Sequence, residues 1–167
     1  MSGWEPYIQN IMNKWTKKDN NFSVSDVCCY AAIIGLDNQQ VWAQSKEWPG
    51  LKSYDHDLDT DDGSKKVVKI DEFQICIAAS NGNRNPTAAG IRFAGQKFMM
   101  ISAEDETKTA YLSRSGGGGA TICRTNKALV IGVWDKFKNT SKGLPQVAGD
   151  CSETVERVAK FMREQGF

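Results

Sequence analysis

The sequence has no hydrophobic run of the length that a membrane helix requires. Apolar stretches such as Tyr30–Ile34 and Ala128–Val133 are far shorter than the roughly 20 residues that cross a bilayer. The residues after the initiator methionine, Ser2–Glu5, do not resemble a secretory signal peptide. We therefore expect a cytoplasmic protein.

Histidine and paired cysteines are equally scarce. The one histidine, His56, lies in an acidic segment, so a catalytic triad is not expected. The five cysteines form no C-x-x-C pair, which argues against zinc sites and a disulfide framework, and we expect five reduced thiols. No G-x-S-x-G motif occurs. These absences indicate a protein that is not an enzyme and uses no metal or cofactor, with an unrelated small hydrolase kept as an alternative.

A surplus of charge of one sign is also missing. The chain has 21 basic and 20 acidic side chains, a net charge of +1, so a general basic surface for nucleic acid is not expected. A length of 167 residues suits one hydrophobic core. We expect a monomer with a single domain over residues 1–167.

Apolar stripes predict a helix at each end of the chain. At the N-terminal end, Ser2 and Glu5 have capping-box spacing. Near the C-terminal end, Asp150 and Glu153 have the same spacing. The apolar residues of the two helices recur at helical intervals, namely Trp4, Tyr7, Ile8, Ile11, Met12 and Trp15 in the first and Val155, Val158, Ala159 and Met162 in the second.

Short apolar segments between these helices predict strands. Val27–Gly35 and Val41–Ser45 form one hairpin, and Asp71–Ser80 forms a short helix. Five further strands follow with short turns, at Gly90–Phe93, Lys97–Ser102, Thr109–Ser113, Ala120–Arg124 and Ala128–Trp134. This order predicts an α+β fold with a central antiparallel β-sheet, and with both terminal helices packed on one face of the sheet.

Two unusual segments carry no recognisable chemistry. Ser53–Lys66 is rich in aspartate, but glycine and glutamate are absent from the positions that an EF-hand loop requires, so we expect a solvated surface loop, with weak cation binding or a regulatory contact as alternatives. Gly116–Gly119 lacks the lysine and hydroxyl of a phosphate-binding loop. We expect a flexible hairpin or a close approach of the backbone to a partner there.

Aromatic residues on both terminal helices suggest a binding surface. Trp4 and Tyr7 are about one helical turn apart and share a face. Phe161 and Phe167 lie in and after the last helix. If the two helices are neighbours, these rings form a shelf of the kind that binds an extended proline helix. Burial of each ring in the core is the alternative.

Several segments of this sequence resemble the profilin family. They are Ser2–Ile8 with its Trp and Tyr three residues apart, Ala31–Gly35 followed by Val41–Ala43, Ala94–Met99, Gly116–Val133, and the final helix from Cys151 to Phe167. They occur in the same order as in the family and cover most of the chain. The acidic insertion within Lys52–Val68 resembles the enlarged acidic loops of some protist profilins.

The resemblance implies a fold and a proline-binding surface. Profilins have a central antiparallel sheet with the terminal helices together on one face. Carried over by position, the residues implied to bind proline-rich ligands are Trp4, Tyr7, Trp42, Phe161, Met162 and Phe167. The implied partners are proline-rich proteins such as formin-type actin elongators.

The resemblance also implies binding of monomeric actin, regulation of actin polymerisation and a cytoskeletal location. The actin-binding positions would be Lys97, Met99, Arg114, Thr121, Gly149 and Ser152. Because Ser152 and Glu153 depart from the family pattern, an adaptor that binds proline-rich peptides and holds actin weakly is the alternative. Phosphoinositide lipids are a third implied ligand, with charge from Arg92, Lys97, Arg114 and Arg124.

Overall fold

The computed structural model describes residues 3–15 and 22–167. Within these residues the helices are α1 (Glu5–Met12), α2 (Glu72–Ser80) and α3 (Ala148–Glu164). The strands are β1 (Lys14–Trp15), β2 (Phe22–Val24), β3 (Tyr30–Gly35), β4 (Val41–Gln44), β5 (Ser53–Asp59), β6 (Lys65–Asp71), β7 (Ile91–Phe93), β8 (Gln96–Glu104), β9 (Thr109–Arg114), β10 (Gly118–Arg124) and β11 (Ala128–Asp135). No helix in these two ranges has the length and hydrophobicity needed to span a membrane.

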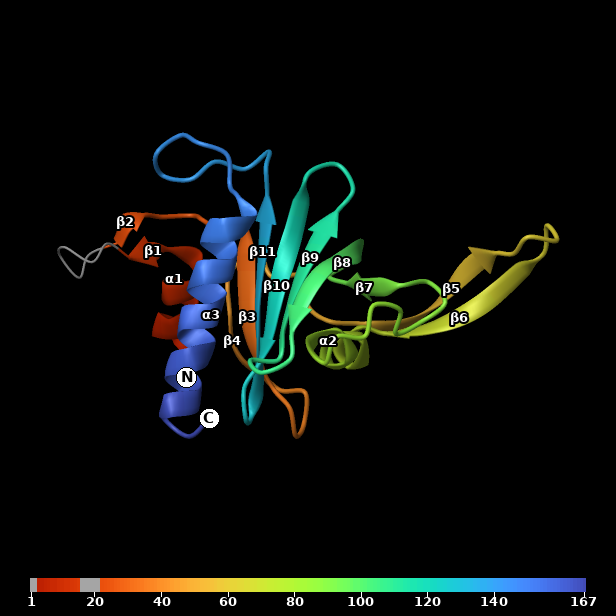
Figure 1. Cartoon of the computed structure of the whole chain (residues 1–167), viewed down its shortest axis with the longest axis horizontal. Helices are drawn as coiled ribbons and strands as arrows, with labels where there is room; N and C mark the ends of the chain where they lie inside the picture. The colour runs from red at the N-terminus through yellow and green to blue at the C-terminus, as the bar shows by residue number, and fades with distance from the viewer. Residues whose placement is uncertain (1–2, 16–21) are drawn as a thin grey trace.

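Seven strands form one antiparallel sheet in the order β4-β3-β11-β10-β9-β8-β7 (Figure 1). The predicted α+β class and the central antiparallel sheet are confirmed. Strand β11 lies inside the sheet, and its residues Ala128–Val133 are all buried. A strand that is covered on both faces has no polar side, which explains the continuous apolar run in the sequence.

Different helices cover the two faces of the sheet. On one face α1 and α3 pack against each other and against the sheet, as predicted, and bury residues such as Ile11, Val130 and Val155 (Figure 1). On the other face α2 covers a second apolar cluster that includes Phe73 and Ile122. We call these the α3 face and the α2 face.

The predicted starts of the two terminal helices need correction. Helix α1 begins at Glu5 with Trp4 as its N-cap and no side-chain cap, while Ser2 lies outside the described residues. Helix α3 begins at Ala148 with Val147 as its N-cap, so the predicted capping box of Asp150 and Glu153 is wrong. Asp150 instead lies in the first turn, where a carboxylate is favourable beside the helix N-terminus.

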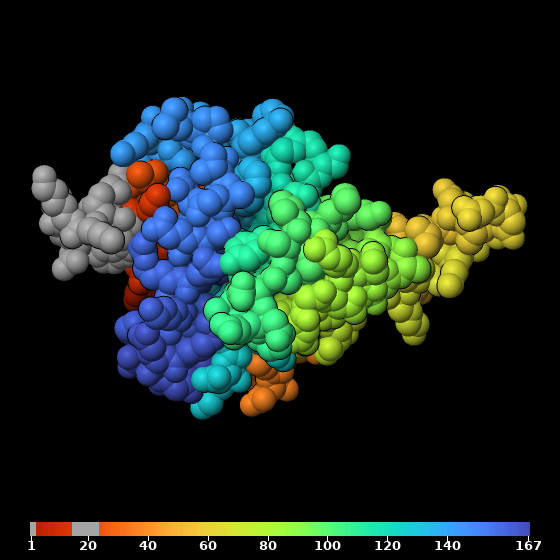
Figure 2. All heavy atoms as spheres, viewed as in Figure 1, coloured from red at the N-terminus to blue at the C-terminus, as the bar shows by residue number. Residues whose placement is uncertain are grey.

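The prediction of a surface loop over Ser53–Lys66 is also wrong. Strands β5 and β6 form a hairpin, which we call the arm, and it projects from the body of the protein (Figures 1 and 2). On one side of the arm Asp55 is paired with Lys69, and Asp59 with Lys65. On its other side apolar residues such as Val68 and Ile70 alternate with these charges. Opposite charges across the hairpin and a half-buried apolar side stabilise strands that read as a polar loop in the sequence.

The glycine run Gly116–Gly119 connects β9 to β10. Gly116 and Gly117 have φ angles of +92° and +98°, which favour glycine in this turn. A Cβ atom on Gly119 would lie 2.2 Å from the carbonyl oxygen of Leu112 on β9. The predicted hairpin is confirmed, and the close backbone approach at Gly119 is to β9 of the same sheet.

Candidate functional site

Five aromatic rings meet where the two ends of the chain come together. The ring centroid of Trp4 lies 5.0 Å from that of Tyr7, 5.0 Å from that of Trp42 and 4.8 Å from that of Phe167. The Tyr7 ring lies 5.8 Å from the ring of Phe161. We call these five residues the ring cluster. All five side chains remain partly exposed, so the rings are available to a ligand.

The sheet and the chain end position the rings. A Cβ atom on Gly35 would lie 2.5 Å from the indole nitrogen of Trp42, so glycine in β3 leaves room for this ring against the sheet. Phe167 is held by its carbonyl oxygen, which accepts a hydrogen bond of 3.0 Å from the Asn126 amide. The Lys127 ammonium also lies 5.5 Å from the centroid of the Phe167 ring.

Met162 differs from the other predicted proline-binding residues. Its side chain is 0% exposed and belongs to the core cluster beneath the rings. A ligand on the surface therefore cannot touch Met162 directly, and its place is that of a support under the ring cluster. The inner stripe of α3 predicted this position, because Val155, Val158 and Met162 are all buried.

The predicted actin-binding residues of β8 lie on the α3 face and are open to solvent. Lys97 is exposed and Met99 is 71% exposed. The alternate residues of the strand, Phe98 and Met100, are buried in the core of the α2 face. Ile101, which is 60% exposed, lies two residues farther along β8, where the register between β8 and β9 shifts. Sequence reasoning missed Ile101, because the register shift between Met100 and Ser102 interrupts the two-residue alternation that starts at Met99.

Thr121 and the start of α3 lie next to this surface but contact each other. Thr121 is buried, and its hydroxyl lies 2.9 Å from the hydroxyl of Ser152. This hydrogen bond ties β10 to α3 and occupies both side chains. Gly149, one turn earlier, is exposed at the surface.

Arg114 does not join the other predicted actin-binding residues. Strand β9 alternates, and Leu112 belongs to the core of the α2 face, so Arg114 lies on that face too. Its guanidinium forms an ion pair of 3.3 Å with Asp135 and a hydrogen bond with Gln96. The sheet therefore separates Arg114 from Lys97 and Met99.

The four basic residues predicted to bind lipid headgroups do not form one patch. Arg92 and Lys97 are direct cross-strand partners on β7 and β8. Arg114 is paired with Gly118 at the start of β10, whereas Arg124 ends that strand. Six residues of extended strand separate these two ends by roughly 20 Å.

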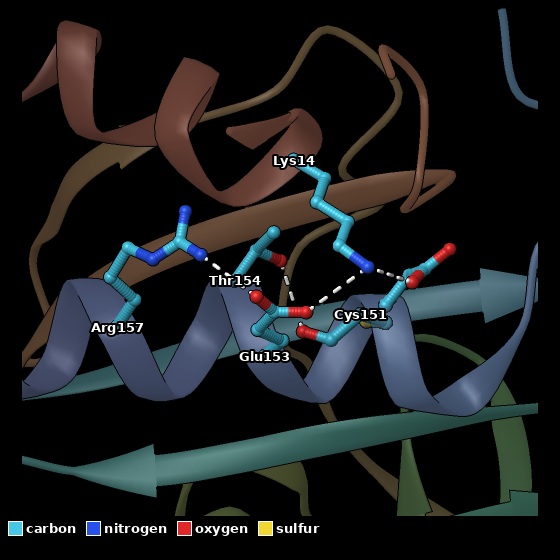
Figure 3. A network of polar contacts seen from close by, with 6 residues as sticks. Lys14, Cys151, Glu153, Thr154 and Arg157 are labelled. Atoms are coloured by element: carbon cyan, nitrogen blue, oxygen red, sulfur yellow. Dashed lines mark hydrogen bonds and ion pairs between the residues drawn. The ribbon is translucent and has the colours of Figure 1, made fainter. Parts of the chain in front are cut away.

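A polar network fixes the start of α3 (Figure 3). The Lys14 ammonium lies 3.0 Å from the Asp150 carboxylate and 3.3 Å from that of Glu153. Hydrogen bonds to these two carboxylates raise the pKa of Lys14. Glu153 also pairs with Arg157 at 2.9 Å. These contacts hold α3 against the segment that follows α1.

Comparisons with known proteins agree with this arrangement. A model of the profilin family matches residues 2–167. The chain is 29% identical to the profilin of Tetrahymena pyriformis over 169 residues, which cover 100% of both chains.

Solved structures show the same fold. The structure is similar to that of Acanthamoeba castellanii profilin IA, with a TM-score of 0.60, 21% identity, and coverage of 98% of this chain and 99% of that chain. It is also similar to mouse profilin IIa in complex with a double repeat from the FH1 domain of mDia1, with a TM-score of 0.57, 20% identity and 99% coverage of both chains. Because the family match spans nearly the whole chain and the fold agrees, this chain belongs to the profilin family.

Proposed function

We propose that this protein binds monomeric actin, regulates actin polymerisation and binds proline-rich ligands through the ring cluster, without covalent catalysis. The observation that carries this proposal is the meeting of Trp4, Tyr7, Trp42, Phe161 and Phe167 at one partly exposed surface. Three separate segments of the chain supply these rings, and the ring contacts keep them together.

Proline-rich segments suit this surface for a physical reason. A polyproline helix has an exposed backbone and little conformational freedom to lose, so it docks well between fixed aromatic rings. The similar mouse profilin IIa was solved with an FH1 repeat, which supports a proline-rich partner of the formin type here.

The actin-binding part of the proposal rests on the exposed surface of β8 and the start of α3. Lys97, Met99 and Gly149 offer charge, apolar area and backbone to a partner. We add Ile101 to this surface. Thr121 and Ser152 act as supports for it, because their hydroxyls are paired with each other. Such a protein would work in the cytoplasm, at the cytoskeleton.

A titration with poly-L-proline, followed by tryptophan fluorescence, tests the ring cluster. We expect a saturable change, because Trp4 and Trp42 lie in the cluster. Trp4→Ala should weaken binding more than about tenfold, since central aromatic residues commonly carry most of a binding surface's energy. Trp48→Phe is the matched control, because Trp48 is buried in the core of the α2 face. A folded protein without any saturable change would contradict the proposal.

A second candidate is a profilin-fold adaptor that binds proline-rich peptides and holds actin weakly. The observation that favours it is the engagement of Arg114 with Asp135, which keeps a predicted actin contact on the other face of the sheet. Assembly of pyrene-labelled actin distinguishes the two candidates. Inhibition of spontaneous nucleation at micromolar protein supports the first, and unchanged assembly supports the second.

Phosphoinositide binding is proposed only at the cross-strand pair of Arg92 and Lys97. The charge there is small, so the expected affinity is low. Co-sedimentation with phosphoinositide-containing vesicles should fall when Lys97 is changed to Glu. Equal co-sedimentation of the wild type with vesicles of neutral lipid would exclude this ligand.

A further inference from the structure

Two cysteines that are far apart in the sequence meet in the core of the α3 face. The sulfur atoms of Cys28 and Cys151 are 2.9 Å apart, although 123 positions separate the residues in the chain. Cys28 lies just before β3, and Cys151 lies in the first turn of α3. Both side chains are 0% exposed. The contact therefore joins α3 to the segment that leads into β3.

The surroundings hold both sulfur atoms at this contact. The Cys28 thiol lies 3.5 Å from the carbonyl oxygen of Ile11, and the Thr154 hydroxyl lies 3.9 Å from its sulfur. A Cβ atom on Gly132 would lie 3.1 Å from the Cys151 sulfur and 3.3 Å from the Cys28 sulfur. Glycine at this position of β11 thus leaves room for the sulfur pair between the sheet and α3.

The other cysteines have different neighbours. The Cys29 thiol lies 3.2 Å from the carbonyl oxygen of Val133, on the strand next to it. Cys123 contacts the Thr109 hydroxyl at 3.1 Å. Cys76 belongs to the core on the opposite face of the sheet. Cys28 and Cys151 thus differ from the other three cysteines, because their sulfur atoms contact each other directly.

We propose that Cys28 and Cys151 form a dithiol site that a peroxide oxidises to an intramolecular disulfide. One thiolate attacks the peroxide, the O–O bond breaks, and a sulfenic acid and one water form. The second thiol attacks the sulfenic sulfur, the S–S bond forms, and a second water leaves. Two thiols are oxidised and hydrogen peroxide is reduced to two waters. A disulfide has an S–S length of about 2.05 Å, so the sulfur atoms need to approach by only about 1 Å.

A surface cavity borders the dithiol site on the side of Cys28. This cavity has a volume of about 250 Å³, and its lining includes Cys28, Cys29, Asp26 and Gln146. Cys28 borders this cavity and Cys151 is absent from its lining, so Cys28 is the thiol nearer to an oxidant there; because its side chain is 0% exposed, a local opening has to admit the peroxide to its sulfur. Burial raises the pKa of the Cys151 thiol well above its usual value, so little of this residue is thiolate at neutral pH. The order of the steps is then sulfenic acid on Cys28 and resolution by Cys151.

The disulfide would close most of the chain into one loop. A link across so long a loop removes conformational freedom from the unfolded chain and stabilises the fold. For a chain of this size we expect the melting temperature to rise by about 10 °C on oxidation. This inference is independent of the proposed ligands.

Peptide mapping of the full chain tests the proposal. The reduced protein is treated with hydrogen peroxide, its remaining thiols are alkylated, and it is digested without reductant. We expect a peptide pair that joins Cys28 to Cys151, the loss of two hydrogen masses from the intact chain, and restoration of both thiols by dithiothreitol. Melting curves before and after oxidation give the predicted shift.

Three alanine variants sharpen the test. Cys28→Ala and Cys151→Ala should lose the link and the oxidation-dependent shift in melting temperature. Cys29→Ala is the matched control, because it removes the neighbouring thiol and should keep both. Three results from the wild-type protein would overturn the proposal: all thiols remain after peroxide treatment, the link involves Cys29, or disulfides form only between two chains. These results do not depend on whether any variant folds.

Discussion

At the scale of single residues, Trp42 can take its position only because residue 35 is a glycine and has no side chain. The Trp42 indole lies over the backbone of β3 at that glycine and stacks on Trp4 with an angle of 26° between the rings. Any Cβ atom at position 35 would lie 2.5 Å from the indole nitrogen, so the ring or the strand has to move. The ring cluster is therefore sensitive to a residue that is itself buried beneath it.

We expect Gly35→Ala to weaken poly-L-proline binding by about three- to tenfold, because a displaced Trp42 no longer stacks on Trp4. The fluorescence titration measures this effect. Gly149→Ala, in the first turn of α3, is the control for the loss of a glycine, because a Cβ atom there meets nothing within 4 Å. Equal affinity of Gly35→Ala and the wild type would show that Trp42 does not contribute to the binding surface.

Two partly buried groups that can lose a proton, the Cys29 thiol just before β3 and the Tyr30 phenol at its start, predict a loss of stability at alkaline pH. Burial raises the pKa of Cys29 to about 11 and that of Tyr30 to about 12. In the folded state these groups keep their protons at a pH where the unfolded chain has released them. The stabilisation is complete below pH 9 and is lost as the pH rises through 9 toward 11 and above.

We expect the free energy of unfolding to fall by about 1–2 kcal/mol between pH 9 and pH 11. Urea denaturation at a series of pH values measures it. Cys29→Ala should flatten the first part of the fall, since the thiol is then absent. A free energy of unfolding that is constant, or that rises, over this interval would contradict the assignment.

At the scale of secondary structure, one buried carboxylate joins the arm to the body. Glu72 opens α2 and is 1% exposed. One of its oxygens accepts a hydrogen bond of 2.9 Å from the Lys52 amide, just before β5. The other oxygen accepts 3.3 Å and 3.5 Å hydrogen bonds from the Gly95 amide and the Tyr54 hydroxyl. A two-stranded hairpin is marginal alone, so these contacts at its base stabilise its position.

We expect Glu72→Gln to destabilise the protein by about 1–3 kcal/mol, because an amide NH₂ group then faces a donor in a buried site. Urea denaturation gives the loss, and hydrogen exchange should show faster exchange in β5 and β6 than in β10. Glu106→Gln is the control on an exposed glutamate. Unchanged exchange in the arm would mean that Glu72 does not hold it.

At the scale of the whole molecule, the two proposed binding surfaces lie on opposite flanks of the sheet. Trp42 is on β4 and Met99 is on β8, five strand spacings away in the order of the sheet. At about 4.8 Å per spacing, this is roughly 24 Å along the sheet. Helices α1 and α3 lie on the same face between them (Figure 1). One protein molecule therefore has room for two ligands at once.

We expect the two surfaces to be separable by mutation. Met99→Glu should weaken actin binding about tenfold or more and leave poly-L-proline binding unchanged, whereas Trp4→Ala should do the reverse. Analytical ultracentrifugation of labelled monomeric actin mixed with a proline-rich peptide measures simultaneous binding. If one protein molecule binds both ligands, the peptide sediments with actin only when the protein is present. If either single variant loses both actin binding and poly-L-proline binding, the two surfaces are coupled or the variant is unfolded. Circular dichroism shows whether the variant is folded.

Much of this arrangement is already determined by the sequence. The apolar stripe of α3 is a local pattern, and its buried residues Val155 and Met162 follow from helical spacing alone. The strands of the sheet and the short helix α2 follow from similar local periods. Four of the ring cluster's residues belong to the two terminal helices and their ends, so their meeting requires only that these helices are neighbours.

The tertiary structure decided what depends on partners distant in the sequence. The aspartates of β5 read as a loop until Lys65 and Lys69 lie opposite them. The ion pair of Arg114 with Asp135 forms because β9 and β11 place both side chains on the same face. Cys28 and Cys151 meet only when α3 packs on β11. The physical reason is the same in each case: spacing along the chain fixes which residues share a face, and only packing fixes what that face meets.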